Sequence, residues 1–549
     1  MPRIIFDADQ IERDYGFRPL DRLLFSAIRL DSHRFVMPLI YRDEAGQTLL
    51  VRQQEQGNVL SAGVAPGQLR FYEPWVTIDP RPVADFPAAA SLPVLVRELA
   101  GDATVELDER APYVHFSALA GEVEVKVPRS PSPRALVYEV DRQEVLDRFK
   151  GWRSRGVEVA ERLIDELPHL AGLEQHLGAT SDSRYSGLCE VAAELEVEAL
   201  LLSSPPNVSE VAGLRATDGA VALWLKSGER VLLIVEEGVR SLPGTPVSRH
   251  TSVAAAIIEY AGVGRIGFEE QWERTALALD LIELGVRPVS ASRPLGSWRD
   301  VRDHEDLAFQ LIAARASVTA IDAAVAWAHA KLDGGDRFTE RDMYRIYLEA
   351  LDDFRLAQRI PFAIEPYFTN LHSSQRMLFP GPPTDFPIDE TTTCVQLDAG
   401  VKVTIDGVTV ATSDMARSLL RTPEGQEAYQ ILTSAVREAI IGKLRPGVVC
   451  EDVHAGVLAH LAHVRPRMIE IGLLGPEVDF DTEYRKRNVG HLMGKQESFA
   501  NELRPGYRHV LEVGSYGAAE IPWRYGRHAI GTEDLWFIGT EKTYNLTLS

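Results

Sequence analysis

The sequence has few cysteines, and they do not cluster. Its 549 residues include three, Cys189, Cys394 and Cys450, which lie far apart and form no CxxC pair. An odd and scattered set of this kind builds neither a disulfide framework nor a thiolate zinc site. We therefore expect buried, reduced thiols. We also assign Cys394 to a core strand rather than to a ligand set.

Positive charge and long apolar runs are also scarce. The chain carries 58 Lys and Arg residues against 80 Asp and Glu residues, a net charge of −22. Such a surface repels phosphate backbones and anionic headgroups, so we expect no nucleic acid partner and no membrane partner. No apolar run of about 18 residues is present, and residues 1–17 lack an apolar signal-peptide segment. The sequence predicts a soluble, cytoplasmic protein.

The composition is otherwise that of a globular protein long enough for several domains. Apolar residues make up 45% and charged residues 25% of the chain. Alternating short strands and helices predict one α/β domain over residues 1–170 and a second over residues 171–308. A long helical stretch opens the third domain, residues 309–549, and Thr339 is expected to cap its next helix.

The first two domains share a faint internal similarity. Residues 48–57, TLLVRQQEQG, align with residues 230–239, RVLLIVEEGV, and residues 95–109 align with residues 257–271. Two interpretations stay open at this point. The first domain is either a degenerate copy of the second or an unrelated unit of the same class.

Acidic residues flank a predicted hairpin in the third domain. Asp406-Gly407 stands between alternating apolar residues, which is a strong hairpin signal. With a two-residue loop position 398 faces position 415, so one bulge or a longer loop would bring the carboxylates of Asp398 and Asp414 side by side. Two like charges in a sheet repel unless a proton or a cation lies between them. A metal ion is the natural cause.

A second acidic hairpin is expected nearer the carboxyl terminus, with Glu512 in its first strand and Glu533 in its second. Between the two hairpins lies His491 in VGHLMG, where flanking glycines allow a bend that presents one imidazole. Four carboxylates and one histidine suit two hard or borderline divalent ions better than one structural zinc.

The segments LDAG, SDMAR, GHLMG, RPGYRHVLEVG and GTED, in this order, resemble the signature of the pita-bread metallopeptidase family, which includes aminopeptidase P, prolidase, methionine aminopeptidase and creatinase. The resemblance implies two divalent ions, manganese or iron first and cobalt or zinc as alternatives. The ligands it implies are Asp398, Asp414, His491, Glu512 and Glu533. It also implies an α/β fold, in which one or two creatinase-like amino-terminal domains precede a pita-bread catalytic domain. A homodimer is the expected assembly.

Several positions depart from the family pattern. The peptidases carry a second histidine seven residues after the ligand histidine, where this chain has Ser498. Gly531 stands where relatives commonly carry an arginine. An earlier family histidine is matched by His372, although the spacing to Asp398 is stretched. By the resemblance, His372 would stabilise the oxyanion and Glu512 would move the proton of the attacking water.

Three functional hypotheses follow. The leading one is a dinuclear-metal hydrolase that cleaves a C–N bond in a small peptide or amino-acid-like substrate, similar to Xaa-Pro aminopeptidase and prolidase. The second keeps the metal pair in a non-peptidase enzyme, such as a creatinase-like hydrolase, a lyase or an oxygen-using iron or manganese enzyme. The third is a metal-free scaffold or binding module.

Other polar residues near the predicted ligands receive structural interpretations. We favour a structural ion pair over substrate contact for Arg417. The loop Trp523-Arg524-Tyr525 either covers the site or only shields a turn from solvent. Three helical histidines are interpreted as surface or half-buried residues without a ligand role: His454, His460 and His463.

Overall fold

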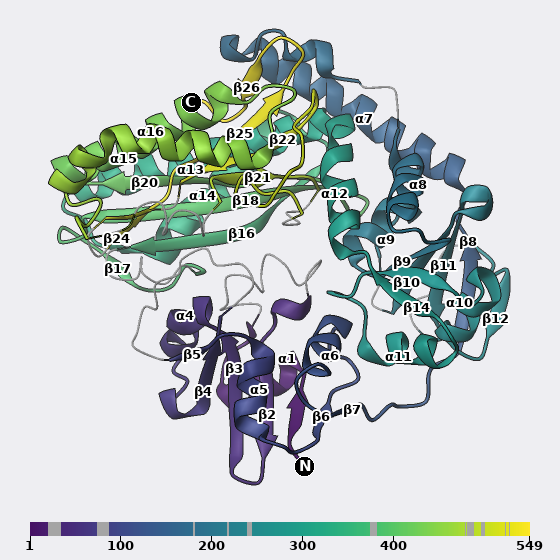
Figure 1. Cartoon of the computed structure of the whole chain (residues 1–549). Coiled ribbons are helices and arrows are strands. Elements are labelled where there is room, and N and C mark those ends of the chain that lie inside the picture. Colours follow the sequence, from purple (N-terminus) through teal and green to yellow (C-terminus); the bar gives the residue numbers. More distant parts are fainter. Residues whose placement is uncertain are drawn as a thin grey trace.

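The computed structural model describes residues 1–19, 34–73, 87–178, 182–216, 219–238, 244–373, 381–477, 479, 488–495, 500–521, 523–525 and 528–549. Its elements form three units (Figure 1). In that view the first unit, in purple, lies at the bottom, the second, in blue and teal, lies at the right, and the third, in green and yellow, lies at the upper left. The predicted α/β class is confirmed.

The first unit is a seven-stranded sheet with helices on both faces. Its strands are β1 (Arg3–Ile5), β2 (Leu39–Asp43), β3 (Gly46–Arg52), β4 (Leu69–Tyr72), β5 (Ala88–Ala89), β6 (Val105–Leu107) and β7 (Val125–Lys126), in the order β5-β4-β3-β2-β1-β6-β7. Its helices are α1 (Ala8–Tyr15), α4 (Gln56–Ser61), α5 (Leu92–Ala100) and α6 (Tyr113–Leu119). Leu39 and Ile40 belong to different apolar clusters because successive strand residues point to opposite faces.

The second unit is a sheet of the same size. Its strands are β8 (Ala135–Glu139), β9 (Ala199–Leu202), β10 (Ala220–Leu225), β11 (Arg230–Glu236), β12 (Ser248–His250), β13 (Arg265–Phe268) and β14 (Arg287–Ser290), in the order β12-β8-β11-β10-β9-β13-β14. Its helices are α8 (Arg184–Glu194), α9 (Pro205–Ala212), α10 (Val253–Ala261), α11 (Thr275–Glu283) and α12 (Ser292–Arg302). Every residue of β10 is buried, as its unbroken apolar run predicts for a strand covered on both faces.

The two sheets share an arrangement of five strands. The order β3-β2-β1-β6-β7 in the first matches β11-β10-β9-β13-β14 in the second. In both, the first three strands are antiparallel and the last two pairings are parallel. The aligned sequence segments fall on equivalent strands, β3 with β11 and β6 with β13. The duplication stays a prediction, and this shared order supports it.

The boundary predicted at residues 170 and 171 needs correction. Strand β8 lies within the predicted first domain, yet it pairs with β11 and β12 of the second sheet. The 24-residue helix α7 (Arg142–Asp165) follows it and separates it from β9 in sequence. A strand joins its sheet through backbone hydrogen bonds to distant segments, so no local pattern shows that β8 belongs to the second unit.

The third unit has two halves, each with helices and a four-stranded antiparallel sheet. The first half contains α13 (Leu307–Asp333), α14 (Glu340–Ala357), β16 (Ala363–Ser373), β18 (Cys394–Ile405), β19 (Val408–Thr412) and β20 (Met415–Leu420). The second contains α15 (Pro423–Ser434), a π-helix (Ala435–Ile440), α16 (Cys450–Glu470), β21 (Gly490–Leu492), β22 (Tyr516–Glu520), β25 (Glu533–Ile538) and β26 (Thr543–Asn545). The halves meet where β20 contacts β25. This is the predicted pita-bread arrangement.

Two helices of the third unit show how sequence determines position. Thr339 caps α14 through a reciprocal pair of hydrogen bonds with Asp342, as expected. Among the described residues, α13 is the one helix whose length and composition would suffice to cross a membrane. About two thirds of its apolar window is buried, because it packs against α7, α14 and β18.

Candidate metal centre

The first acidic hairpin forms as predicted. Ile405 pairs with Val408 across a two-residue turn in which Asp406 and Gly407 have φ angles of 53° and 79°. These left-handed conformations match the twist of the strands and explain the Asp-Gly pair. The pairing then shifts by one residue, because Thr404 faces Thr409 whereas Val403 faces Ala411. The extra residue lies in β19.

That bulge has the opposite effect to the one predicted. An extra residue in β18 would have placed Asp398 opposite Asp414, but an extra residue in β19 places Asp398 opposite Ala416. The two carboxylates are therefore diagonal neighbours on adjacent segments rather than direct partners. Asp398 is half-buried and accepts a hydrogen bond of 3.0 Å from Nδ2 of Asn370 on β16.

Strand β21 carries His491 into the core of the third unit. Gly490 has a φ of 134°, and a Cβ atom there would lie 2.2 Å from the carbonyl oxygen of Ala518. Only glycine permits this approach, which accounts for the residue before the histidine. The imidazole is buried, and its Nδ1 lies 3.2 Å from the carbonyl oxygen of Leu492. The other ring nitrogen, Nε2, faces Asp414.

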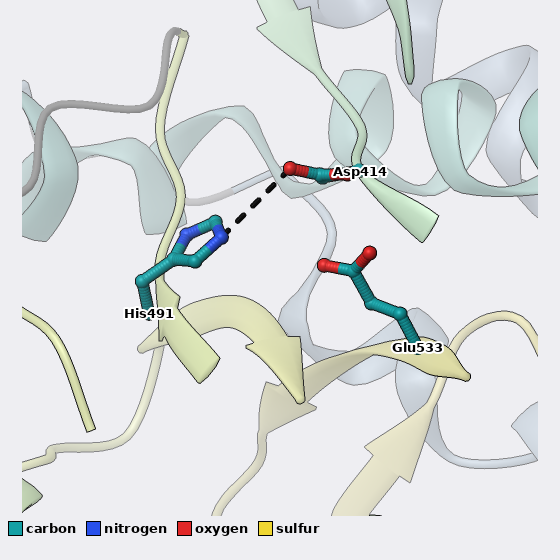
Figure 2. A group of neighbouring side chains, drawn as sticks. All are labelled: Asp414, His491 and Glu533. Atoms are coloured by element: carbon teal, nitrogen blue, oxygen red, sulfur yellow. Dashed lines mark ion pairs between the residues drawn. The ribbon is translucent and has the colours of Figure 1, made fainter. Parts of the chain in front are cut away.

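Three of the predicted ligands meet at one point. Figure 2 shows the side chains of Asp414, His491 and Glu533 pointing toward one another from three separate segments. All three are buried, and one ligand atom of each lies within 4.8 Å of those of the others. Nε2 of His491 is 3.8 Å from Oδ2 of Asp414, too long for a hydrogen bond. This spacing accommodates a cation at about 2.0–2.2 Å from each atom, so the donor set fits a divalent ion.

Glu512 does not join this group. Residues 511–515 form a turn rather than the predicted strand, with Gly514 at a φ of 96°. The side chain of Glu512 is exposed, and its backbone N–H donates to Oγ of Ser515 at 3.0 Å. The apolar residues around Glu512 suggested a strand, but the left-handed glycine delays the strand until Tyr516.

Glu520, the last residue of β22, is a candidate ligand that was not predicted from the sequence. Glu520 pairs directly with Glu533 on β25, and Ala518 pairs with His491 on β21. Opposite residues, and residues two apart on one strand, share a face of the sheet, so Glu520 lies on the face of His491 and Glu533. Glu520 is the last residue of β22 and Glu533 is the first residue of β25, so the two glutamates flank the segment of residues 521–532. A glutamate just before this segment, matching Glu533 just after it, was the signal that the sequence offered.

Arg417 has the structural role that was favoured for it. Its guanidinium is buried, donates to the backbone oxygen of Glu533 at 2.6 Å and pairs with Asp534 at 2.6 Å. Burial alone would raise the pKa of Asp534, but the charges of Arg417 and Arg437 outweigh it and hold that pKa below its usual value. The ion pair fixes the backbone that carries Glu533.

His372 and Gly531 border the same region. His372 is buried on β16, opposite Gln396 and two residues beyond Asn370, so it shares the face of the residue that bonds Asp398. At Gly531 a Cβ atom would lie 2.0 Å from Nε2 of Gln396. A side chain at this position would displace the amide of Gln396, which occupies the space beside Gly531.

The remaining predicted residues fall elsewhere. Ser498 lies outside the described residues. The segment Trp523-Arg524-Tyr525 forms a short strand, β23 (Trp523–Tyr525), but its side chains are not among those that the structure describes. His454 is fully buried on α16, where a surface or half-buried position was predicted, while His463 is exposed. His460 is half-buried, and no described metal group includes the three histidines.

The thiols largely meet expectation. All three cysteines are free, and Cys394 and Cys450 are buried, whereas Cys189 is half-buried. Cys394 lies in β18, a core strand as predicted. Burial raises the pKa of the Cys450 thiol to about 12, so it stays protonated at neutral pH and is a poor ligand.

Comparison with known proteins supports the fold described above. The family described as metallopeptidase family M24 matches residues 311–540. An X-prolyl aminopeptidase from Caenorhabditis elegans is 12% identical, covers 98% of this chain and 83% of its own, and has a TM-score of 0.58. A prolidase from Pyrococcus horikoshii is 16% identical and covers 67% of this chain and 98% of its own, with a TM-score of 0.50.

A third similar structure carries a different name. The amino-terminal domain of the FACT complex subunit SPT16 from Cicer arietinum is 13% identical and covers 67% of this chain and 95% of its own, with a TM-score of 0.50. At these identities the likenesses show the fold alone. No curated protein matches the chain.

Proposed function

Because residues 311–540 match metallopeptidase family M24, we propose that the chain is a metal-dependent hydrolase that cleaves an amide bond in a small peptide or amino-acid-like substrate. The observation that carries the proposal is the convergence of Asp414, His491 and Glu533, three buried donors from separate segments. A protein that kept the fold but lost metal binding would not need to keep these three side chains together.

In this proposal two divalent ions, manganese or iron before cobalt or zinc, bind side by side. Asp414, His491 and Glu533 would hold one ion, and Asp398 and Glu520 would complete the set for the second. Such ions, when bound, lower the pKa of a water molecule and polarise a substrate carbonyl. Glu520 replaces Glu512 in the set because it shares a sheet face with His491 and Glu533.

The protein groups supply proton transfer and orientation. A carboxylate oxygen of Glu520 would take the proton of the attacking water and pass it to the leaving nitrogen. His372, buried beside the Asn370–Asp398 hydrogen bond, is the candidate donor to the oxyanion. Arg417 keeps Glu533 in place through its backbone oxygen.

A second candidate function has its own support. Gly531 stands where relatives commonly carry an arginine near the last ligand, and the amide of Gln396 occupies the space beside it. The sequence also has Ser498 in place of the second family histidine. Both differences favour a substrate other than an ordinary peptide, so a non-peptidase hydrolase or lyase at the same metal pair is the alternative.

The proposal also includes the setting of the enzyme. The net charge of −22 supports a small-molecule or short-peptide substrate over nucleic acid or membrane partners. We place the enzyme in the cytoplasm as a homodimer, by analogy with the family.

Metal analysis followed by a substrate screen tests the proposal. Purified protein is reconstituted with manganese, iron, cobalt or zinc and its metal content is measured. We expect two ions per chain, and less than one in Asp414→Ala. The loaded protein is then assayed with Xaa-Pro dipeptides and tripeptides and with other small amides. Turnover of peptides supports the leading function, and turnover of other amides alone supports the second. Failure to bind any ion overturns both in favour of a scaffold.

A further inference from the structure

Seven charged side chains lie buried where the segment that carries His491 meets the second unit. The cations and anions are Arg153, Arg184, Lys495, Asp182, Glu210, Glu305 and Asp306. The most exposed of these side chains, Asp182, has an exposed fraction of 13%, and that of Lys495 is 2%. We call this set the junction cluster.

Six members of the junction cluster form a closed ring in which charges alternate. Lys495 contacts Glu210 at 3.0 Å and Asp306 at 2.8 Å. Arg184 joins Glu210 to Asp182 through contacts of 2.8 Å and 2.6 Å. Arg153 closes the ring, at 3.2 Å from Asp182 and 2.8 Å from Asp306. Each ring carboxylate is thus shared by two cations.

The ring surrounds an aromatic side chain and has one further anion. The guanidinium of Arg184 lies 3.6 Å from the centroid of the Phe149 ring, and Nζ of Lys495 lies 4.8 Å from it. Glu305 pairs with Arg153 at 3.2 Å and accepts from the backbone N–H of Ser183 at 2.6 Å. Cations over an aromatic face are favourable, so Phe149 supports both.

Lys495 is the one member that comes from the segment of residues 490–495, which also carries His491. Arg153 lies on α7, Arg184 and Glu210 lie on α8 and α9, and Asp306 directly precedes α13. Lys495 follows His491 by four residues. A buried ammonium is stable only where its carboxylates meet it with good geometry, so the ring fixes where this segment runs.

The same segment is held from the opposite side. The carbonyl oxygen of Gly494 accepts a hydrogen bond of 3.0 Å from Oγ1 of Thr412, two residues before Asp414. Thr412 and Lys495 therefore fix adjacent residues of this segment, one toward the hairpin and one toward the second unit. The path from Lys495 to His491 is short, so a shift at Lys495 moves the imidazole relative to Asp414.

We propose that Lys495 is a positioning residue through which the second unit sets the distance between His491 and Asp414 and hence the affinity of the site for metal. This inference rests on the proposed metal-dependent function. The second unit then contributes to the structure of the metal centre. The metal centre therefore needs the whole chain for its full affinity for metal.

The test compares two substitutions in the full-length protein. Lys495→Met removes the contact to the metal segment, whereas Arg153→Met removes an equally central cation of the ring and leaves both carboxylate contacts of Lys495. Both variants should be less stable, because each leaves buried carboxylates with one cation fewer. Only Lys495→Met should weaken Mn²⁺ binding, by roughly 10- to 100-fold, the effect typical of groups that orient metal ligands. Calorimetric titration with Mn²⁺ measures this difference.

A charge-balanced variant guards against misfolding of Lys495→Met. The double variant Lys495→Met with Glu210→Gln removes one charge of each sign, so it should fold better than Lys495→Met alone. It still lacks the contacts between residue 495 and the ring carboxylates. Its Mn²⁺ affinity should stay low, whereas Lys495→Arg should restore most of it. Unchanged affinity in the double variant, or an equal loss in Arg153→Met, overturns the proposal.

Hydrogen exchange separates failure of this inference from failure of the proposed function. Backbone amides of residues 490–495 should exchange faster in Lys495→Met than in Arg153→Met, whether or not metal is present. If the native protein binds no Mn²⁺ but this difference is found, the positioning role stands and the metal-dependent function fails. If exchange is equal in the two variants, the positioning role fails.

Discussion

Glu520 and Glu533 face each other on β22 and β25, and like charges in direct opposition destabilise a sheet by themselves. Glu512, by contrast, lies exposed in a turn, where a carboxylate has no effect on the sheet. The difference between the two positions is therefore chemical as well as geometric. A cation beside β22 would turn the repulsion between Glu520 and Glu533 into shared ligation.

Removing one carboxylate at each position tests the reassignment. Glu520→Gln keeps the shape of the side chain and removes its charge, so we expect a loss of one bound ion per chain or at least about tenfold weaker binding. Glu512→Gln is the matched control and should bind metal as the native protein does. Elemental analysis and calorimetric titration provide the measurements. The reverse result, with loss only in Glu512→Gln, would restore the assignment made from sequence.

At the scale of single elements, the hairpin over β18 and β19 separates what sequence can predict from what it cannot. Asp406-Gly407 determines the turn because both residues adopt left-handed conformations that few other pairs tolerate. The bulge in β19 leaves no comparable mark in the sequence, since it depends on how β19 pairs with β18 and packs against α13 and α9. For this reason the turn was predicted correctly and the partner of Asp398 was not.

The turn glycine offers a direct measure of that local determinant. Gly407 has a φ of 79°, and a Cβ atom there would lie 3.0 Å from Cδ of Arg215 in the second unit. Gly407→Ala should therefore lower the free energy of unfolding by about 1–2 kcal/mol. Gly456 on α16 has open space around it, so Gly456→Ala should instead raise that free energy by up to about 1 kcal/mol. Urea denaturation compares the two, and equal effects would refute the conformational argument.

Sequence reasoning was most reliable where function constrains single residues and least reliable where distant strands meet. The short segments around Asp414, His491 and Glu533 predict a candidate metal site, because each ligand position needs a particular side chain, and the structure brings these three side chains together. Strand β8 shows the opposite case, since its membership in the second sheet depends on β11, which lies about 90 residues away. Glu520 was missed for a local reason, because the turn at Gly514 delays the start of β22 until Tyr516.

At the scale of the whole molecule, the first unit is attached to the second by backbone hydrogen bonds. The N–H groups of Tyr113 and Val114, at the start of α6, donate to the carbonyl oxygens of Glu273 and Glu270 at 2.8 Å each. Thr275 completes the contact by donating its N–H to the carbonyl oxygen of Ala111 at 2.9 Å. Helix α6 thus belongs to the first unit and forms its attachment to the second, so changes within α6 affect both.

Acidification should weaken this attachment through His115 of α6. Burial lowers the pKa of His115 to about 4, although the hydrogen bond of its ring to the backbone of Phe35 raises that pKa in part. Between about pH 6.5, its unfolded value, and pH 4 the unfolded chain binds a proton that the folded chain does not, so stability is complete above this window and falls within it. The full difference is about 3 kcal/mol.

The uncharged variant His115→Gln removes that proton and should therefore flatten the decline between pH 6.5 and pH 4. The exposed His329 of α13 provides the control, because His329→Gln leaves the buried site unchanged and should follow the native protein across the whole range. Denaturation with urea at a series of pH values gives the free energy of unfolding for each protein. If native protein and His115→Gln lose stability in parallel, the acid sensitivity arises from carboxylates elsewhere and α6 has no part in it.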